Sequence, residues 1–315
     1  MSKINKIRNI LEFFLFIAVV LSVFPDVSAS EVEQTGRGKE ALLDIYNRNT
    51  AQLEENSIGF PLVMESYEQG SRVHVDVYGI FNYPADGIID VLRVPANWCD
   101  IASLHTNVKA CTYKELSGTW LMTFYIGGEG YQPLEDTRPV IYNYRNADEQ
   151  QGYLDITFSA DAGPFGTKDH KMRFEAVQLD EGRTFVHVSY EYSDSVLVRF
   201  AGNLYFLTLG RSKVGFTVTG TDKHGKPIYI GGARGSIERN AVRYYFAIQS
   251  FMNTLSYPEE SRLNMRLSEW YDITSRYRKQ FYELDKLEKK DYLAFKTKEH
   301  MNQITLQMFI STGHQ

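Results

Sequence analysis

The chain contains the stretch Val73-His74-Val75-Asp76-Val77-Tyr78-Gly79, in which three valines alternate with polar or aromatic residues. Such alternation is typical of a β-strand with one buried face. We expect the strand to end at Tyr83, because Pro84 cannot extend it. Apolar residues then recur at helical spacing until Pro95 interrupts them. The sequence therefore predicts a long strand followed by two short helices, Ala85 to Val94 and Ala96 to Ser103.

Aromatic-rich segments on both sides of this stretch also have strand patterning. Short turns rich in Gly and Asp separate several of them, as in antiparallel hairpins. Residues Ser195 to Leu209 fit neither a helical nor a strand period. The predicted strands are Phe60 to Ser66, Thr119 to Ile126, Val140 to Tyr144, Tyr153 to Ser159, Lys171 to Leu179, Thr184 to Tyr192, Gly215 to Gly220 and Pro227 to Ile230.

A long amphipathic helix is predicted from Ser236 to Leu255. Its apolar residues fall on one stripe of a helical wheel, and Arg239 and Arg243 take the opposite side. We expect a shorter helix over Lys39 to Asn56. Apolar residues after Tyr257 recur every three or four positions, which predicts one or two more helices that could cover the outer flank of the long one.

This order of elements predicts an α+β fold. In it a curved antiparallel sheet wraps around a long C-terminal helix (a helix-grip), with extra N- and C-terminal helices. The layout resembles the SRPBCC or START-like helix-grip superfamily, which includes polyketide cyclase and lipid-transport types. The strand at Val73 to Gly79, the break at Pro84, the strand run and the helix Ser236 to Leu255 carry the resemblance. It implies a cavity between sheet and helix that holds a lipid or another hydrophobe.

The first residues are typical of an export signal. Lys3, Lys6 and Arg8 precede an apolar run, and Val27-Ser28-Ala29 offers a cleavage site. The apolar run is short for a membrane span, which favours a signal peptide that is cleaved off. The alternative is an uncleaved anchor. We expect an exported, periplasmic or secreted protein. Its predicted parts are a signal peptide (1–29), an N-terminal linker and short helix (30–57), a START-like domain (58–256) and a C-terminal helical extension (257–315).

Charge and the absence of known motifs exclude several classes of partner and cofactor from our prediction. The net charge is −5 and no basic run is present, so nucleic acid is not an expected partner. We find no phosphate-binding, metal-ligand or nucleophile motif, so no cofactor and no metal are predicted. Cys99 and Cys111 do not have CxxC spacing. In an oxidising compartment we expect them to form a disulfide, with two buried thiols as the alternative.

The resemblance and the aromatic strands together indicate candidate cavity residues. The chain has 21 Tyr against 3 Trp, and Tyr combines an apolar ring with a hydrogen-bonding tip. Pattern alone does not separate cavity lining from solid core, so both interpretations stay open. The candidate ligand-binding residues are Trp120, Met122, Phe124, Tyr142, Tyr144, Phe174, Tyr244, Ile248 and Met252.

Candidate catalytic groups are few. His187 has Glu175 and Glu191 nearby in the predicted hairpin, and Asp169-His170 follows a loop. A His with a carboxylate could do acid–base chemistry, but such residues more often stabilise a sheet. We therefore assign no catalytic residue.

Arg234, Glu238, Arg239 and Arg243 lie near the start of the long helix. Arginines at a helix start could bind an anionic head group. We favour surface pairing between residues four apart.

The sequence thus predicts an exported carrier that holds a hydrophobic small molecule, for example a lipid, between the sheet and the last helix. The helices of Ala85 to Ser103 or the loop Gly127 to Pro139 would gate entry. One alternative is a cyclase- or hydrolase-like enzyme that uses the same cavity. The other is an interaction protein whose cavity is filled by its own side chains. Transient membrane contact, the oligomeric state and the role of the tail stay open.

Overall fold

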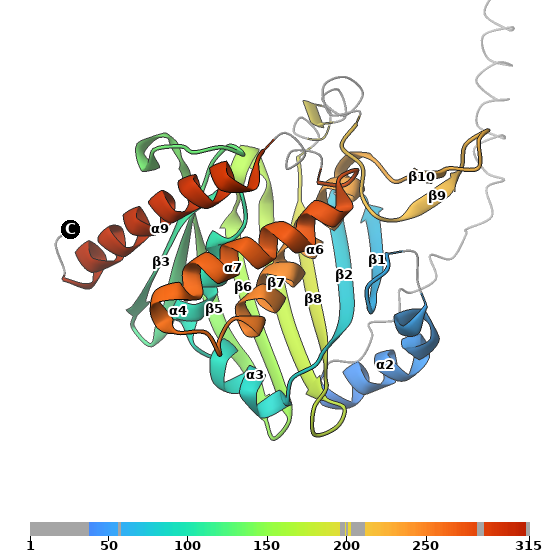
Figure 1. Cartoon of the computed structure of the whole chain (residues 1–315), viewed down its shortest axis with the longest axis horizontal. Helices are drawn as coiled ribbons and strands as arrows, with labels where there is room; N and C mark the ends of the chain where they lie inside the picture. Colours follow the sequence, from blue (N-terminus) through green and yellow to red (C-terminus); the bar gives the residue numbers. More distant parts are fainter. Residues whose placement is uncertain are drawn as a thin grey trace, which may run out of the picture. The chain divides into compact units, whose positions relative to one another are not determined.

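An eight-stranded antiparallel sheet forms the main layer of the described chain (Figure 1). The computed structural model describes residues 38–312 except 56–57, 196–198, 200, 203–211 and 282–286. The strand order is β1-β2-β8-β7-β6-β5-β4-β3, and a separate hairpin pairs β9 with β10. The strands are β1 Leu62–Gln69, β2 Arg72–Phe81, β3 Val108–Leu116, β4 Thr119–Ile126, β5 Arg138–Gln150, β6 Tyr153–Ala162, β7 Lys168–Gln178, β8 Thr184–Ser193, β9 Val218–Thr221 and β10 Pro227–Tyr229.

Helices connect the two edges of this sheet and cover it. Two short helices lie between β2 and β3, and three longer ones follow the hairpin. The helices are α2 Lys39–Glu54, α3 Ala85–Leu92, α4 Pro95–Ser103, α6 Gly232–Asn253, α7 Glu259–Thr274 and α9 Lys289–Ser311, with short 3-10 turns at η1 Leu134–Asp136, η2 Pro164–Gly166 and η3 Ser275–Tyr277. Among the described helices, none has both the length and the apolar character needed to cross a membrane.

The strand predicted from the alternating valines is β2. Val73, Val75 and Val77 are each 0% exposed, because they face α6, whereas His74 and Asp76 face the other side of the sheet. Pro84 caps α3 and Pro95 begins α4, as the sequence predicts. The α+β helix-grip prediction is therefore confirmed.

Two parts of the sheet differ from the sequence prediction. β3 was not predicted, because the buried half of this strand includes Lys109 and Thr112 and lacks an apolar alternation. β5 runs from Arg138 to Gln150 and is longer than the predicted segment. Most of the ambiguous segment Ser195 to Leu209 lies outside the described residues.

Helix α6 lies directly against β2. A Cβ atom added to Gly79 would be 2.1 Å from the hydroxyl oxygen of Tyr245, so only glycine allows this approach. The opposite side of α6 is covered by α7, and Trp270 Nε1 donates a hydrogen bond of 3.3 Å to the carbonyl of Arg243. The C-terminal extension thus supplies the cover that the apolar flank of α6 requires.

A second, smaller core lies on the opposite face of the sheet. Leu42, Ile45 and Leu53 of α2 pack there with Tyr78 and Phe185. The predicted N-terminal helix is thus part of the fold, and it shields one end of the face that α6 does not cover (Figure 1).

Helix α9 covers the edge strand β3 by means of glutamine side chains. The Gln303 carboxamide oxygen accepts a hydrogen bond of 2.8 Å from the amide of Cys111. Gln307 accepts one from the amide of Tyr113 and donates one to its carbonyl, each at 2.9 Å. These groups would otherwise be free to pair with another strand. The tail from α9 therefore closes the edge of its own sheet.

Buried ion pairs add to this contact. Lys296 Nζ lies 2.8 Å from a Glu299 carboxylate oxygen and donates to the carbonyls of His105 and Val108. Lys109 pairs with the other oxygen of Glu299 at 3.2 Å. Two cations share one carboxylate, and backbone carbonyls supply the remaining acceptors, as buried charges require.

Cys99 of α4 and Cys111 of β3 form a disulfide, with their Cα atoms 4.9 Å apart. The predicted bond is present in the structure. It fixes α4 to the same edge strand that α9 covers.

We predict that Gln303→Ala lowers the free energy of unfolding by about 1–3 kcal/mol, because it leaves the buried amide of Cys111 without an acceptor. Urea denaturation of the purified protein measures this change. Asn302→Ala on the same helix turn is the matched control and should change stability by less than about 0.5 kcal/mol. Equal stability of the two variants would contradict the edge-capping role of Gln303.

We also predict that Cys99→Ser/Cys111→Ser lowers the unfolding free energy by about 3 kcal/mol, the chain-entropy value for a loop of this length. Guanidinium titration with and without reductant is the measurement. Reductant should destabilise the wild-type protein to the level of the double variant and leave the variant unchanged. A wild-type protein that does not respond to reductant would show that this bond adds no stability.

Candidate functional site

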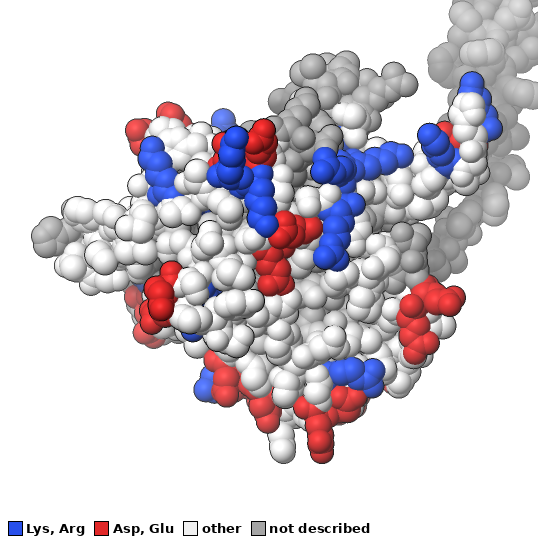
Figure 2. All heavy atoms as spheres, viewed as in Figure 1, with Lys and Arg blue, Asp and Glu red and all other residues white. Residues whose placement is uncertain are grey.

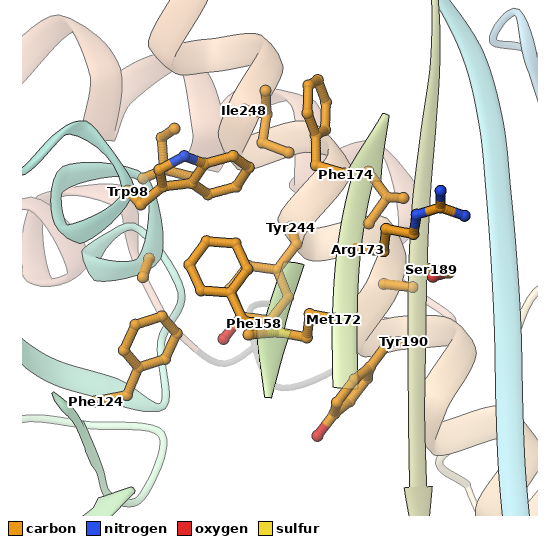
Figure 3. A pocket seen from close by; sticks show the side chains of 14 residues that line it. Trp98, Phe124, Phe158, Met172, Arg173, Phe174, Ser189, Tyr190, Tyr244 and Ile248 are labelled. Atoms are coloured by element: carbon orange, nitrogen blue, oxygen red, sulfur yellow. The ribbon is translucent and has the colours of Figure 1, made fainter. Parts of the chain in front are cut away.

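A small apolar cavity lies between the sheet, α4 and α6 (Figure 3). Its volume is about 30 Å³, which is room for about one or two water molecules. Only apolar surface faces the space. The cavity is lined by Trp98, Ile101, Ala102, Phe124, Phe158, Met172, Arg173, Phe174, Val188, Ser189, Tyr190, Ala241, Tyr244 and Ile248.

Strand alternation decides which side chains point into the cavity. Met172 and Phe174 of β7 face it, and Arg173 between them faces the other side of the sheet. Figure 3 shows the Arg173 guanidinium directed away from the cavity. That guanidinium pairs with Asp155 at 2.7 Å and with Glu175 at 3.0 Å. The arginine thus contributes no charge to the cavity.

Four of the nine candidate residues from the sequence line the cavity, namely Phe124, Phe174, Tyr244 and Ile248. The other five pack in or against the same core but do not line this cavity. The Tyr144 hydroxyl, for example, donates to the carbonyl of Arg93 at 2.9 Å. The five residues outside the cavity wall are Trp120, Met122, Tyr142, Tyr144 and Met252.

Several lining residues were not predicted. Trp98 comes from α4, in which no cavity residue was predicted from the sequence, and Phe158 comes from β6. Met172 and Tyr190 lie within the predicted strands and could have been found by alternation, because they are two positions from Phe174 and Val188. Strand alternation predicts which face of the sheet a side chain lies on, but it does not predict how far the empty space extends.

Tyr190 and His170 form a hydrogen-bonded pair beside the cavity. The Thr167 hydroxyl donates to the carbonyl of Pro164 at 2.6 Å, so it accepts from His170 Nε2 at 2.7 Å. His170 Nδ1 then accepts the Tyr190 hydroxyl proton at 2.9 Å. The Tyr190 oxygen keeps its lone pairs available to a ligand donor.

Both members of this pair are neutral near pH 7. Burial lowers the pKa of His170 to about 4. Burial also raises the pKa of Tyr190 well above its ordinary value. Neither hydrogen bond of the His170 ring goes to Asp169, so the adjacent Asp169-His170 pair predicted as a catalytic candidate does not form a His–carboxylate dyad.

His187 lies on the opposite face of the sheet from the cavity. Its ring stacks on Tyr78 at 4.5 Å, and its Nδ1 and Nε2 atoms lie 2.8 Å from Glu175 and Asp76, respectively. Asp76 also contacts His74 Nε2 at 2.8 Å. Both ring nitrogens of His187 are thus occupied, so this residue links strands of the sheet and does not reach the cavity.

These contacts keep both histidines protonated. Burial alone would lower the pKa of His187, but hydrogen bonds to Asp76 and Glu175 outweigh it and raise the pKa to about 9. The pKa of His74 is raised to about 9 in the same way by Asp76 and Glu191. Burial would raise the pKa of Asp76, yet its two histidine partners hold that pKa well below its usual range.

Glu238, Arg239 and Arg243 near the start of α6 are buried and Arg234 is partly buried, so the prediction of pairs on the solvent-facing side of the helix is wrong. The Glu238 carboxylate is fully buried and accepts from the amides of Phe216 and Thr217 at 2.7 and 3.0 Å. It also accepts from the Ser66 hydroxyl at 2.5 Å, and Arg234 donates to that same hydroxyl oxygen. Glu238 therefore anchors the base of the β9–β10 hairpin to α6.

Metal ligation is not evident in the described chain, since no group of three or more His, Cys, Asp or Glu side chains is placed to hold an ion there.

The order of elements defines the class of fold. Two strands, two short helices, a run of antiparallel strands and a long helix across the sheet make a START-like helix-grip fold. No protein-family model matches the chain, and no curated protein matches it.

Solved structures with low similarity to this chain include the following three proteins. The START superfamily protein from Mycobacterium smegmatis is 12% identical over 44% of this chain and 92% of its own, with a TM-score of 0.29. Human StAR-related lipid transfer protein 5 is 9% identical over 55% and 91%, with a TM-score of 0.30. The Zhui aromatase/cyclase from Streptomyces sp. R1128 is 13% identical over 66% and 95%, also at 0.30. The fold class therefore rests on the topology described above.

We predict that the His187 network stabilises the protein most at pH 6.5 and below, where the histidine is charged in both the folded and the unfolded chain. The folded pKa of about 9 exceeds the ordinary value of 6.5, so this stabilisation is lost as the pH rises through 9. The difference in unfolding free energy between the wild type and His187→Gln should therefore shrink between pH 6.5 and pH 10, by up to roughly 3 kcal/mol.

Urea titrations at several pH values measure this difference. His224→Gln, in the exposed turn of the β9–β10 hairpin, is the control and should give a difference close to zero at every pH. A His187→Gln difference that stays constant from pH 6.5 to pH 10 would show that the His187 charge does not stabilise the fold.

Proposed function

We propose that the protein is an exported carrier that binds a neutral, hydrophobic small molecule between the sheet and α6. The observation that supports this most is the cavity, which is enclosed by three elements of the fold and exposes only apolar surface. An apolar cavity excludes water and gains free energy by taking an apolar ligand. If the cavity widens, a ligand that buries about 200 Å² of apolar surface there would gain roughly 5 kcal/mol from desolvation.

The lining argues for a ligand without charge. Arg173 is the one charged residue among the described lining residues, and its guanidinium is directed to the far face. Tyr190 and Tyr244 are the two tyrosines among the lining residues. Burial raises the pKa of both, so they stay neutral hydrogen-bonding groups. Because the Tyr190 proton goes to His170, the Tyr190 oxygen suits a ligand that ends in a hydroxyl donor.

Ligand entry requires the cavity to widen, because sites for small molecules usually span about 300–1,000 Å³. We expected α3 and α4 or the β4–β5 loop to open the cavity. However, the disulfide ties α4 to β3, and Trp98 Nε1 donates to the carbonyl of Leu92 at 2.6 Å. Met172, Tyr190 and Tyr244 are only partly buried. Rotation of these three side chains is a less costly way to open the space.

The volume of about 30 Å³ favours a second candidate function, an interaction protein with a solid core. In that case Trp98, Phe158 and Tyr244 would simply fill the space between sheet and helix. A cyclase- or hydrolase-like activity would have to use His170, because His187 is on the other face of the sheet.

The test is mass spectrometry of solvent extracts from the purified protein. We predict a stoichiometric neutral hydrophobe in the wild type and its loss, by about tenfold or more, in Ile248→Phe, which adds volume at the cavity wall. Met252→Leu is the matched control, since Met252 is on the same helix but does not line the cavity, and it should retain the ligand. Circular dichroism confirms that both variants fold.

Extraction misses any ligand that the expression host does not make. We therefore also measure thermal unfolding with added neutral alcohols, ketones and esters of increasing size, which detects such ligands. A bound ligand raises the midpoint temperature in proportion to its affinity and concentration. Empty extracts together with no thermal shift would favour the solid-core interaction protein.

A further inference from the structure

The β9–β10 hairpin and the turn after α7 form one basic surface, which we call the basic hairpin surface. Its basic residues are Lys223, Lys226, Arg276 and Lys279, and the exposed aliphatic residues of the hairpin are Val218 and Ile228. Figure 2 shows Lys and Arg side chains gathered over the projecting hairpin and the end of α7.

Contacts between the two segments make this a single surface. Lys279 Nζ lies 4.6 Å from the ring centroid of Tyr229 and donates to the carbonyl of Pro227 at 3.4 Å. The turn after α7 is therefore held against β10.

The positive charge of this surface is not neutralised locally. Lys223, Lys226 and Arg276 form no ion pair with any residue in the described ranges. Asp222 is the acidic residue of the hairpin turn, and its carboxylate accepts from the amides of His224 and Lys226 at 2.8 and 2.9 Å. The whole chain has a net charge of −5, so this concentration of positive charge is a local feature.

The aliphatic side chains on the same hairpin are also exposed. Val218 is 43% and Ile228 is 47% exposed. A two-stranded hairpin gains little stability by itself, so burial in the fold does not account for aliphatic residues that are this exposed. Aliphatic side chains flanked by lysines match the boundary between lipid head groups and acyl chains.

The base of the hairpin is rigidly attached to the helix that covers the cavity. Glu238 of α6 accepts from the amides of Phe216 and Thr217 and from the Thr217 hydroxyl, all within 3.0 Å. A Cβ atom on Gly215 would lie 2.3 Å from the Glu238 carboxylate, so the backbone approaches too closely for any other residue. The base of the hairpin is thus held against the first turns of α6.

We propose that the basic hairpin surface docks on membranes that contain anionic lipids, with Val218 and Ile228 entering the head-group region. The proposal rests on the proposed function in one respect, namely that a bilayer is the place where a hydrophobic ligand would enter or leave the cavity. Nucleic acid fits less well, because Lys279 already covers the face of Tyr229 on which a base would stack.

Vesicle co-sedimentation tests the proposal with the full chain, so that residues 1–37 are the same in every sample. We expect the wild type to bind phosphatidylglycerol-containing vesicles more tightly than phosphatidylcholine vesicles, and the preference to fall as NaCl increases. Each basic residue near an anionic surface strengthens binding roughly fivefold, so Lys223→Glu/Lys226→Glu should weaken binding at least about tenfold. The matched control is Lys114→Glu/Arg183→Glu, which makes the same change in net charge on β3 and in the β7–β8 turn.

A second variant tests the aliphatic part. Val218→Ser/Ile228→Ser keeps every charge and should weaken binding severalfold, with the loss persisting at high salt because it does not depend on electrostatics. Circular dichroism checks that the fold of each variant is intact.

The outcomes separate docking from ligand binding. Docking is overturned if the wild type does not prefer anionic vesicles, or if the control variant loses as much binding as Lys223→Glu/Lys226→Glu. If the wild type binds anionic vesicles through the hairpin but neither extracts nor thermal shifts reveal a ligand, docking stands and the carrier function fails. If ligand is bound and vesicles are not, the carrier function stands and the docking surface fails.

Discussion

The close contact between α6 and β2 is the constraint on which the rest of the structure depends. β2 lies between β1 and β8, and its three valines form the floor under α6. Gly79 lets the Tyr245 ring lie on the strand backbone, so helix and sheet meet without a gap at this point. The cavity exists because this contact is local. Toward β7 and α4 the sheet curves away, and aromatic side chains leave a small apolar space between the layers.

The two faces of the sheet divide the chemistry of the protein. The face toward α6 carries nearly all of the apolar core, whereas the other face carries the chain of charges from His74 through Asp76, His187 and Glu175 to Arg173. Because each strand alternates, a histidine one position from a cavity residue is on the wrong side for catalysis. This explains how His187 can be well placed in sequence among cavity residues and still have a structural role.

The sequence was sufficient to predict the fold class and the order of most elements, because alternation in β2 and the prolines at 84 and 95 are strong local signals. It could not predict β3, whose neighbours across the edge are side chains of α9 some 190 residues later. At the candidate site, strand alternation and the apolar stripe of the long helix were enough to predict four of the lining residues, namely Phe124, Phe174, Tyr244 and Ile248. Trp98 and Tyr190 were not predicted, because the extent of an empty space depends on how side chains from several elements pack together.

The glutamine contacts of α9 have a consequence for biosynthesis. Gln303 is separated by 192 residues from the amide it pairs with, so the ribosome makes the edge strand long before it makes the helix that covers it. At ordinary elongation rates the delay is about 10 to 40 seconds. During that time β3 can pair with any other unprotected strand, including one from a neighbouring nascent chain. A chain that lacked α9 would therefore leave the amides of Cys111 and Tyr113 on β3 without these partners.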